Sequence, residues 1–208
     1  MATKSLSILG DAGAGKKTLV GNLIYKCGLE LPQVEELERE GIRQYAEIVL
    51  FYQRKGYNQF FHAPSGSFVV QSTWAHASKF YGLTEAAASA VPDVVLWVVD
   101  ATDAGNYSTS ARKLATLLSN GALRPREKLL IVVNKMDLVG WSENVFEDVL
   151  RNFVAVDIQT QHAFVPVSAL KDGNVLSSSP EHQWVSNASS SGSEAGKVSG
   201  QALIHQLE

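Results

Sequence analysis

A glycine-rich segment near the N-terminus has the composition of a phosphate-binding loop. It follows an apolar run that ends at Gly10, and a stretch with helical spacing begins at Lys16. Between a strand and a helix, small residues let backbone N–H groups turn toward phosphate oxygens, the helix dipole favours anions, and a lysine adds a point charge. The predicted phosphate-binding residues are Asp11, Ala12, Gly13, Ala14, Gly15, Lys16, Lys17 and Thr18.

One residue of this loop departs from the Walker A pattern. The pattern has Ser or Thr directly after the lysine because that hydroxyl is a ligand of Mg²⁺, whereas this sequence has Lys17. An ammonium group has no lone pair and cannot bind a metal ion, and Thr18, one position later on a helix, would point about 100° away. We therefore predict no metal ligand here. Two interpretations of Lys17 stay open: its side chain points to solvent, or its charge lies near the vacated metal position.

Two later segments have the residue types that recognise guanine. Asn134-Lys135-Met136-Asp137 ends one apolar run, and Ser168-Ala169-Leu170 ends the next. Guanine presents two donors, N1–H and the N2 amine, and one carboxylate can accept both, whereas adenine would leave that carboxylate unpaired at a cost. The lysine stem can cover one face of the base, the asparagine can tie the loop together, and a backbone N–H of the second segment can meet the guanine O6. The predicted guanine-binding residues are Asn134, Lys135, Asp137, Ser168, Ala169 and Leu170.

These loops require a sheet that brings the ends of several strands together. Apolar runs of strand length alternate with stretches of helical spacing, a pattern typical of an α/β fold with a mostly parallel central sheet and helices on both faces. Two β-rich runs around the turn at Ala63–Gly66 favour one antiparallel edge hairpin. We predict strands at 5–10, 58–62, 67–73, 93–100, 128–134 and 163–168, and helices at 16–27, 32 to about 54, 108–119 and 143–153.

The composition indicates one cytoplasmic domain. With 208 residues, 45% of them hydrophobic, and a net charge of −3, the chain can bury a sizeable core and shows no footprint for nucleic acid. The single cysteine, Cys27, excludes an internal disulfide and argues against a cysteine-based zinc site. No apolar run is long enough for a signal peptide or a membrane helix. We expect a single domain over 1–208, with a flexible Ser-rich loop at 186–199, a last helix beginning near residue 200, and further domains outside this chain.

With these motifs, the chain resembles the GTP-binding (G) domain of translational GTPases of the elongation factor 1 alpha type. That family includes eukaryotic release factor 3 and related ribosome-rescue and exosome-adaptor factors. Gly21–Gly28 (GNLIYKCG) nearly reproduces the family's GHLIYKCG, and Val98–Ala101 (VVDA), Val133–Asp137 (VNKMD) and Phe164–Leu176 (FVPVSALKDGNVL) are also similar. The resemblance covers almost the whole chain. It implies the P-loop NTPase G-domain fold, GTP or GDP as the ligand, and a structural role for Cys27.

The departures from this family concern the metal and hydrolysis. No segment corresponds to the family's switch I, and the family's D-A-P-G falls on Trp74-Ala75-His76-Ala77. The aspartate that holds Mg²⁺ is then Trp74, the glycine that meets the γ-phosphate is Ala77, and the catalytic histidine is Ser78. His76 is not assigned that role, because the metal and γ-phosphate contacts that it would need are missing. Since hydrolysis needs Mg²⁺, an oriented water and a transition-state stabiliser, the resemblance implies no catalytic residue.

Three interpretations of the function follow. The favoured one is a translation-factor-like pseudo-GTPase domain that binds GTP or GDP, without Mg²⁺ and without efficient hydrolysis, in translation, mRNA surveillance or ribosome rescue. Its other partners would be the ribosome or surveillance proteins, reached through the full-length chain, with no membrane contact. One alternative is an interaction module that has lost nucleotide, although such a module has no chemical need for Asp137. The other alternative is a slow GTPase that a residue in trans activates.

Overall fold

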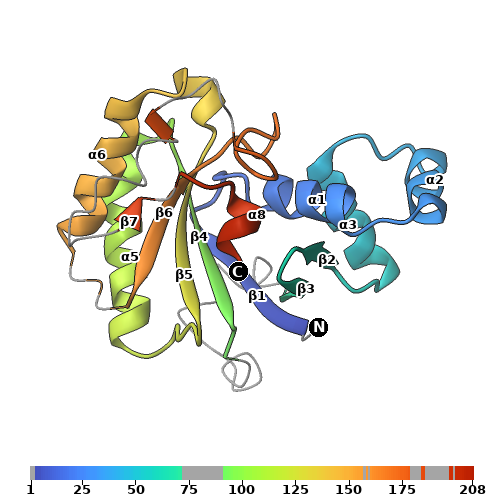
Figure 1. Cartoon of the computed structure of the whole chain (residues 1–208), viewed down its shortest axis with the longest axis horizontal. Helices are drawn as coiled ribbons and strands as arrows, with labels where there is room; N and C mark the ends of the chain where they lie inside the picture. Colours follow the sequence, from blue (N-terminus) through green and yellow to red (C-terminus); the bar gives the residue numbers. More distant parts are fainter. Residues whose placement is uncertain are drawn as a thin grey trace.

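The computed structural model describes residues 3–71, 91–156, 158, 160–178, 184–185, 197–198 and 200–208. Figure 1 shows a central sheet with α5 and α6 on one face, α1 and α8 on the other, and α2 and α3 projecting beyond its edge. The helices and strands are β1 (Thr3–Gly10), α1 (Lys16–Cys27), α2 (Leu31–Arg39), α3 (Tyr45–Lys55), β2 (Phe60–Ala63), β3 (Gly66–Gln71), β4 (Val94–Asp100), α5 (Tyr107–Ser119), β5 (Lys128–Asn134), α6 (Glu143–Val154), β6 (His162–Pro166), β7 (Lys197–Val198) and α8 (Leu203–Gln206), with 3₁₀ turns at Ala104–Asn106 and Met136–Val139.

The sheet has the predicted, mostly parallel topology. Its strand order is β2-β3-β1-β4-β5-β6-β7. Every neighbouring pair is parallel except β2 and β3, which form the predicted antiparallel hairpin at one edge. Nearly every residue of β4 and β5 is buried, as expected for central strands covered by helices on both faces. The predicted α/β G-domain fold is therefore confirmed, and the carboxyl ends of β1, β5 and β6 meet at one edge of the sheet.

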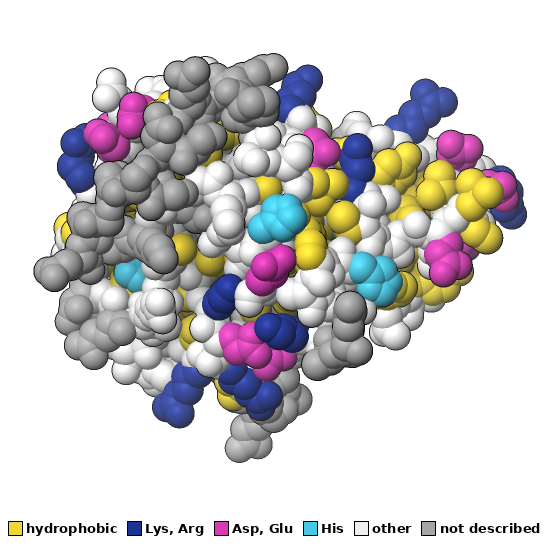
Figure 2. All heavy atoms as spheres, in the orientation of Figure 1, with side chains coloured by type: hydrophobic (Ala, Val, Ile, Leu, Met, Phe, Trp, Pro, Cys, Tyr) yellow, Lys and Arg dark blue, Asp and Glu magenta, His cyan; other side chains and the backbone are white. Residues whose placement is uncertain are grey.

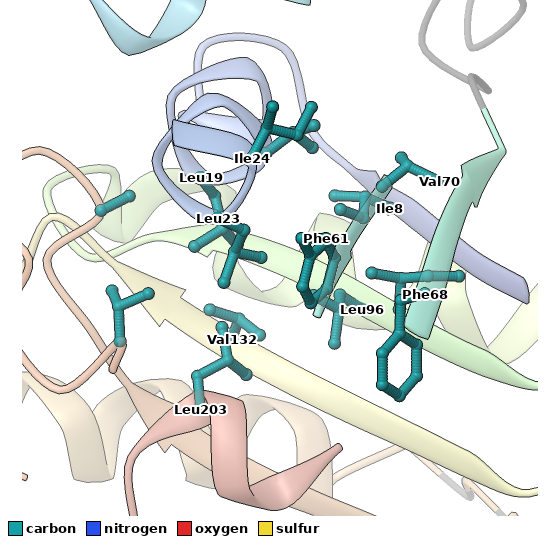
Figure 3. Close-up of a cluster of buried hydrophobic side chains, with 14 of the residues drawn as sticks. Ile8, Leu19, Leu23, Ile24, Phe61, Phe68, Val70, Leu96, Val132 and Leu203 are labelled. Carbon is teal, nitrogen blue, oxygen red and sulfur yellow. The ribbon is translucent and has the colours of Figure 1, made fainter. Parts of the chain in front are cut away.

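Two apolar layers hold the helices against the sheet. On the α1 face, Leu23 packs above the strands, Phe61 and Phe68 stack with ring centroids 5.4 Å apart, and Leu203 of α8 closes the layer (Figure 3). On the other face, Leu114 of α5 and further residues of α6 pack against β4 and β5. Because α1 directly follows the predicted phosphate loop, the first layer fixes the position of that loop relative to the strands.

The single acidic helix predicted from residue 32 to about 54 is wrong, because the structure has two helices there. α2 ends before Gly41, whose φ of 71° is the left-handed conformation that terminates helices. α3 then begins with a capping box in which Gln44 and Glu47 satisfy each other's backbone N–H groups. The mixed apolar and charged periodicity of this segment continues through the glycine, so periodicity alone conceals the break.

The two helices form a lobe, α2–α3, that stands beside the sheet. Figure 2 shows hydrophobic side chains on the surface of this lobe, with charged side chains around them. Leu31, Leu50 and Tyr57 are among the exposed large hydrophobic residues. The lobe is joined to the rest of the molecule mainly where α3 packs on α1.

The C-terminal part of the chain contains the short helix α8 and the short strand β7. The last helix begins close to the predicted position, as the short helix α8, and Leu203 and Leu207 are buried there. The end of the segment predicted as a flexible loop forms β7, which pairs with β6, and most of that segment lies outside the described residues. In the described part of the chain, no helix has the length and apolarity needed to cross a membrane.

Replacing Gly21 should destabilise the fold through the contact between α1 and α3. A Cβ at position 21 would lie 1.8 Å from the backbone oxygen of Tyr45, so Gly21→Ala must push the two helices apart. We expect a loss of about 1–3 kcal/mol in the free energy of unfolding, measured by urea denaturation. Gly105→Ala is the control, because its Cβ would have its nearest neighbour at 4.0 Å. Equal stability of the two variants would contradict the close packing of α1 on α3.

Candidate nucleotide-binding site

The predicted phosphate loop connects β1 to α1 and depends on its glycines. Gly10, Gly13 and Gly15 have φ values of 129°, 76° and 89°, which residues with a side chain rarely adopt. A Cβ on Gly10 would lie 2.1 Å from the Val98 oxygen, and a Cβ on Gly15 would lie 2.3 Å from Nδ2 of Asn134. At Gly13, no atom lies within 4 Å of the Cβ position. The loop is thus packed against β4 and β5 at Gly10 and Gly15 and is open at Gly13, as an anion-binding loop requires.

Lys16 is held over this loop by the loop's own backbone. Its Nζ donates hydrogen bonds to the carbonyl oxygen of Gly10, at 2.9 Å, and to that of Asp11. Burial lowers the pKa of Lys16, the nearby Asp11 carboxylate opposes that shift, and the charges of Lys113 and Lys17 add to it. The ammonium group therefore has a fixed position in an environment where an additional anion would be favourable.

A cavity of about 980 Å³ lies in front of the loop and extends along α5. Its wall includes three lysines, Lys16, Lys17 and Lys113, and the acidic side chain of Asp11. Lys17 therefore lines the cavity, and both interpretations of its role stay open. Seven of the eight predicted phosphate-binding residues line it, namely Asp11, Ala12, Gly13, Gly15, Lys16, Lys17 and Thr18, and Ala14 is buried.

The amide of Asn134 joins the phosphate loop to the predicted guanine-binding segments. Its Nδ2 donates to the carbonyl oxygen of Ala14 at 2.9 Å, and its Oδ1 accepts from the backbone N–H of Ala169, also at 2.9 Å. The residue is 2% exposed, so both hydrogen bonds are shielded from water. One side chain at the end of β5 thereby connects the loop after β1 to the loop after β6.

Lys135 and Asp137 lie on the turn that follows Asn134. Nζ of Lys135 pairs with Oδ2 of Asp100 at 2.5 Å, which fixes the end of the side chain. Burial alone would raise the pKa of Asp100, but hydrogen bonds from Lys135 and Thr102 lower it overall, so the carboxylate stays ionised. Asp137 is half-exposed, and within the described part of the chain its carboxylate makes no hydrogen bond or ion pair. It is free to accept two donors from a ligand.

The loop after β6 leaves one predicted backbone donor for a ligand. The N–H of Ser168 donates to the Gly173 oxygen at 2.8 Å, and that of Ala169 is taken by Asn134. Leu170, which is 63% exposed, is the remaining residue of the segment whose N–H has no partner in the described part of the chain. Of the three residues predicted to meet the guanine O6, the structure therefore favours Leu170.

Asn22 on α1 is a site residue that the sequence analysis did not identify. It is fully buried, and its Nδ2 donates to the Ala169 oxygen at 3.0 Å, so both backbone groups of Ala169 are held by asparagine side chains. The available signal was a polar residue between the apolar residues Val20 and Leu23. It lies where the resembled family has histidine.

Backbone strain is concentrated around the same two loops. Within the described residues, the non-glycine residues with positive φ are Lys135, Trp141, Asp172 and Asn174, with values between 53° and 67°. Lys135 and Trp141 flank the 3₁₀ turn after β5, and Asp172 and Asn174 follow the Ser168–Leu170 segment. Such conformations cost energy and persist where the surroundings impose them, often at functional sites. These residues lie on or beside the two loops that carry the predicted guanine-binding residues.

The residues predicted to depart from the family's hydrolytic machinery, Trp74, His76, Ala77 and Ser78, lie outside the described residues. Among those that the structure describes, no group of three or more His, Cys, Asp or Glu side chains could hold a metal ion. The candidate site therefore consists of the phosphate loop, Asn134, Lys135, Asp137 and the segment after β6.

Sequence relatives of the chain include translation factors. It is 24% identical over 230 residues to elongation factor 1-alpha-A of Schizosaccharomyces pombe, covering 97% of this chain and 48% of that protein. It is 27% identical over 198 residues to the bifunctional enzyme CysN/CysC of Mycobacterium tuberculosis, covering 86% of this chain and 31% of that protein. No family model matches it. The chain thus spans about a third to a half of the length of these relatives.

Solved structures with the same fold carry guanine nucleotides. The S. cerevisiae Ski7 GTPase-like domain bound to GDP and inorganic phosphate has a TM-score of 0.63 at 20% identity, covering 99% of this chain and 48% of that one. Sup35 complexed with GMPPNP has a TM-score of 0.58 at 18% identity, covering 99% of this chain and 44% of that one. The fold is that of these GTPase-like domains. By sequence, the chain is similar to the part of elongation factor 1-alpha that it spans.

Replacing Asn134 should loosen both loops. Asn134→Ala leaves the Ala14 oxygen and the Ala169 N–H buried without their partner, which typically costs about 1–3 kcal/mol each. We expect a lower free energy of unfolding, by about 2 kcal/mol or more, in urea denaturation. Asn152→Ala is the control, since Asn152 makes an exposed hydrogen bond on α6. If the two variants are equally stable, the Asn134 amide does not hold the loops together.

Proposed function

We propose that this chain is a guanine-nucleotide-binding domain that binds GTP and GDP without efficient hydrolysis. The observation that carries the proposal is the amide of Asn134, which fixes the phosphate loop beside the turn that carries Asp137, whose carboxylate has no partner among the described residues. We propose that phosphate and base are recognised in one site, with the phosphates at the loop that lines the cavity and the base beside Asp137, outside that lining. The related folds of Ski7 and Sup35, solved with GTP, GDP or GMPPNP, support the same class of ligand.

Each recognition step has a candidate group in this chain. The open face of the loop at Gly13 would accept phosphate oxygens on backbone N–H groups, and Lys16 would add its charge. Asp137 would accept N1–H and the N2 amine of guanine, and Leu170 would offer its N–H to O6. The stem of Lys135, held by Asp100, would lie along the base. Because no efficient hydrolysis of the nucleotide is proposed, the role of these groups is to bind and orient it.

The phosphate side is proposed to work without Mg²⁺. The position after the loop lysine is Lys17, whose ammonium cannot be a metal ligand, and it lines the same cavity as Lys16. A second cation in that wall can offset phosphate charge in place of a divalent ion. The replacements at Trp74, Ala77 and Ser78 remove, by resemblance, the groups that would hold metal and water. Slow or absent hydrolysis follows from the loss of these groups together.

The proposed setting is a larger translation-factor-like protein in the cytoplasm. The chain spans 48% of its elongation factor 1-alpha relative, and that relative acts in translation by name. We therefore propose a role in translation, mRNA surveillance or ribosome rescue, with the ribosome or surveillance proteins as partners through other parts of the protein. Within the domain, nucleotide would be a structural ligand or a weak switch.

Guanine nucleotides should bind far more tightly than adenine nucleotides. Asp137 rewards two donors that adenine lacks, and sites of this type can discriminate by about 10⁴ or more. Competition of GDP and ATP against a fluorescent guanine nucleotide measures the ratio. Asp137→Asn should weaken GDP and GTP alike, whereas Asp148→Asn, on the exposed face of α6, should change neither. Competition by ATP at concentrations comparable to GDP would refute the assignment of the base site.

Nucleotide affinity should depend little on Mg²⁺. With Lys17 in place of the metal-binding hydroxyl, a fluorescent guanine nucleotide should bind with similar affinity in Mg²⁺ and in EDTA. Lys17→Ser should lower affinity in EDTA and leave hydrolysis at background, because one restored hydroxyl does not replace the other missing groups. A loss of tenfold or more on chelation, about 1.4 kcal/mol, would show that the wild-type chain uses a metal.

A further inference from the structure

Asp11 introduces a negative charge into the loop that is proposed to bind phosphate. It directly follows Gly10, its side chain is only 11% exposed, and it lines the cavity in front of the loop. A carboxylate and a phosphate chain that share a partly buried cavity repel each other more strongly than they would in water. The loop therefore needs a way to offset this charge if it is to accept an anion.

Lys113 of α5 supplies that charge from a distant part of the chain. Its Nζ lies 2.6 Å from Oδ1 of Asp11, although the two residues are 102 positions apart in sequence. α5 buries Ser110, Ala111 and Leu114 against the sheet, and Lys113 occupies the flank of the helix that borders the cavity. The neighbouring Arg112 is turned back onto Ser108 of its own helix, at 3.2 Å from the Ser108 carbonyl and hydroxyl oxygens. Lys113, and not Arg112, is thus the cation that meets the loop carboxylate.

The balance of charge in the cavity wall depends on this pair. The positive charges of Lys17 and Lys113 lie close enough to Lys16 to lower its pKa, and the negative charge of Asp11 acts to raise it. With Asp11 paired to Lys113, the charges of Lys16, Lys17 and Arg112, which also line the cavity, remain for a ligand. Without Lys113, the carboxylate would cancel one of them and face the phosphate chain unpaired.

We propose that Lys113 sets the affinity of the loop for nucleotide phosphates by neutralising Asp11 and holding its carboxylate against α5. Lys113 is a positioning residue, because it acts on the ligand through Asp11 and does not itself bind phosphate. The inference rests on the proposed function, since it concerns the same ligand. Repulsion by an unpaired Asp11 grows with the charge of the ligand, so the loss of Lys113 should affect GTP more than GDP and should not affect guanosine.

The test compares wild type, Lys113→Ala, Asp11→Asn and the double variant in EDTA. We expect Lys113→Ala to raise the Kd for GDP about tenfold and that for GTP further, and to leave the guanosine Kd unchanged in an NMR titration. Asp11→Asn should bind GTP more tightly than wild type. The double variant should return to within about threefold of wild type, because removal of the carboxylate makes the neutralising lysine unnecessary. Calorimetric titration at two salt concentrations measures these constants for GDP and GTP.

Lys4→Ala is the matched control, since Lys4 pairs with Glu127 at 2.7 Å at the opposite end of β1 and its loss should leave all Kd values unchanged. If Lys113 binds phosphate directly, the double variant will be as weak as Lys113→Ala, and the proposal is overturned. It is also overturned if Lys113→Ala weakens guanosine as much as GTP, which would indicate a general distortion of the site. If wild type binds GDP but Lys113→Ala binds equally well, this inference fails and the proposed function stands. A wild-type chain that binds no guanine nucleotide would overturn both.

Discussion

The amide of Asn134 is the contact on which the geometry of the site depends. A parallel sheet brings the carboxyl ends of β1, β5 and β6 to one edge, but it does not fix the loops that leave them. Asn134 does so with two buried hydrogen bonds, one to each neighbouring loop, and Asn22 adds a third from α1. Because these bonds are shielded from water, losing a partner costs more than it would at the surface.

The two halves of the candidate site differ in how closely they match the resembled family. The base side retains the asparagine, lysine and aspartate of the resembled family in a geometry that leaves the aspartate available. On the phosphate side, Lys17 stands where the Walker A pattern has a neutral metal-binding hydroxyl. The carboxylate of Asp11 in the loop pairs with Lys113 of α5.

Much of the fold and of the site could be predicted from the sequence, because the relevant signals are local. The continuous apolar runs of β4 and β5, the helical spacing of α1 and the turn composition between β2 and β3 each determine an element through neighbouring residues. The break at Gly41 leaves no such signal, because the periodicity on either side of it is similar. The contacts from Asn22 to Ala169 and from Lys113 to Asp11 span 147 and 102 residues, so they depend on which elements become neighbours in the folded sheet. No local pattern reports such a contact.

The construction of the α2–α3 lobe has a consequence for how the molecule comes apart. α2 buries only Leu37, and its ion pairs from half-buried Glu36 and exposed Glu40 to Lys55 remain open to solvent and contribute little stability. The capping box at the start of α2 and the left-handed Gly41 after its end involve residues of the helix and its flanks only, so they do not tie α2 to the sheet. α2 can therefore unfold in a low-energy, sub-global opening while α3 stays packed on α1 and the sheet stays closed. Amide protons of α2 should then exchange with solvent early, and those of β4 and β5 should exchange only on global unfolding.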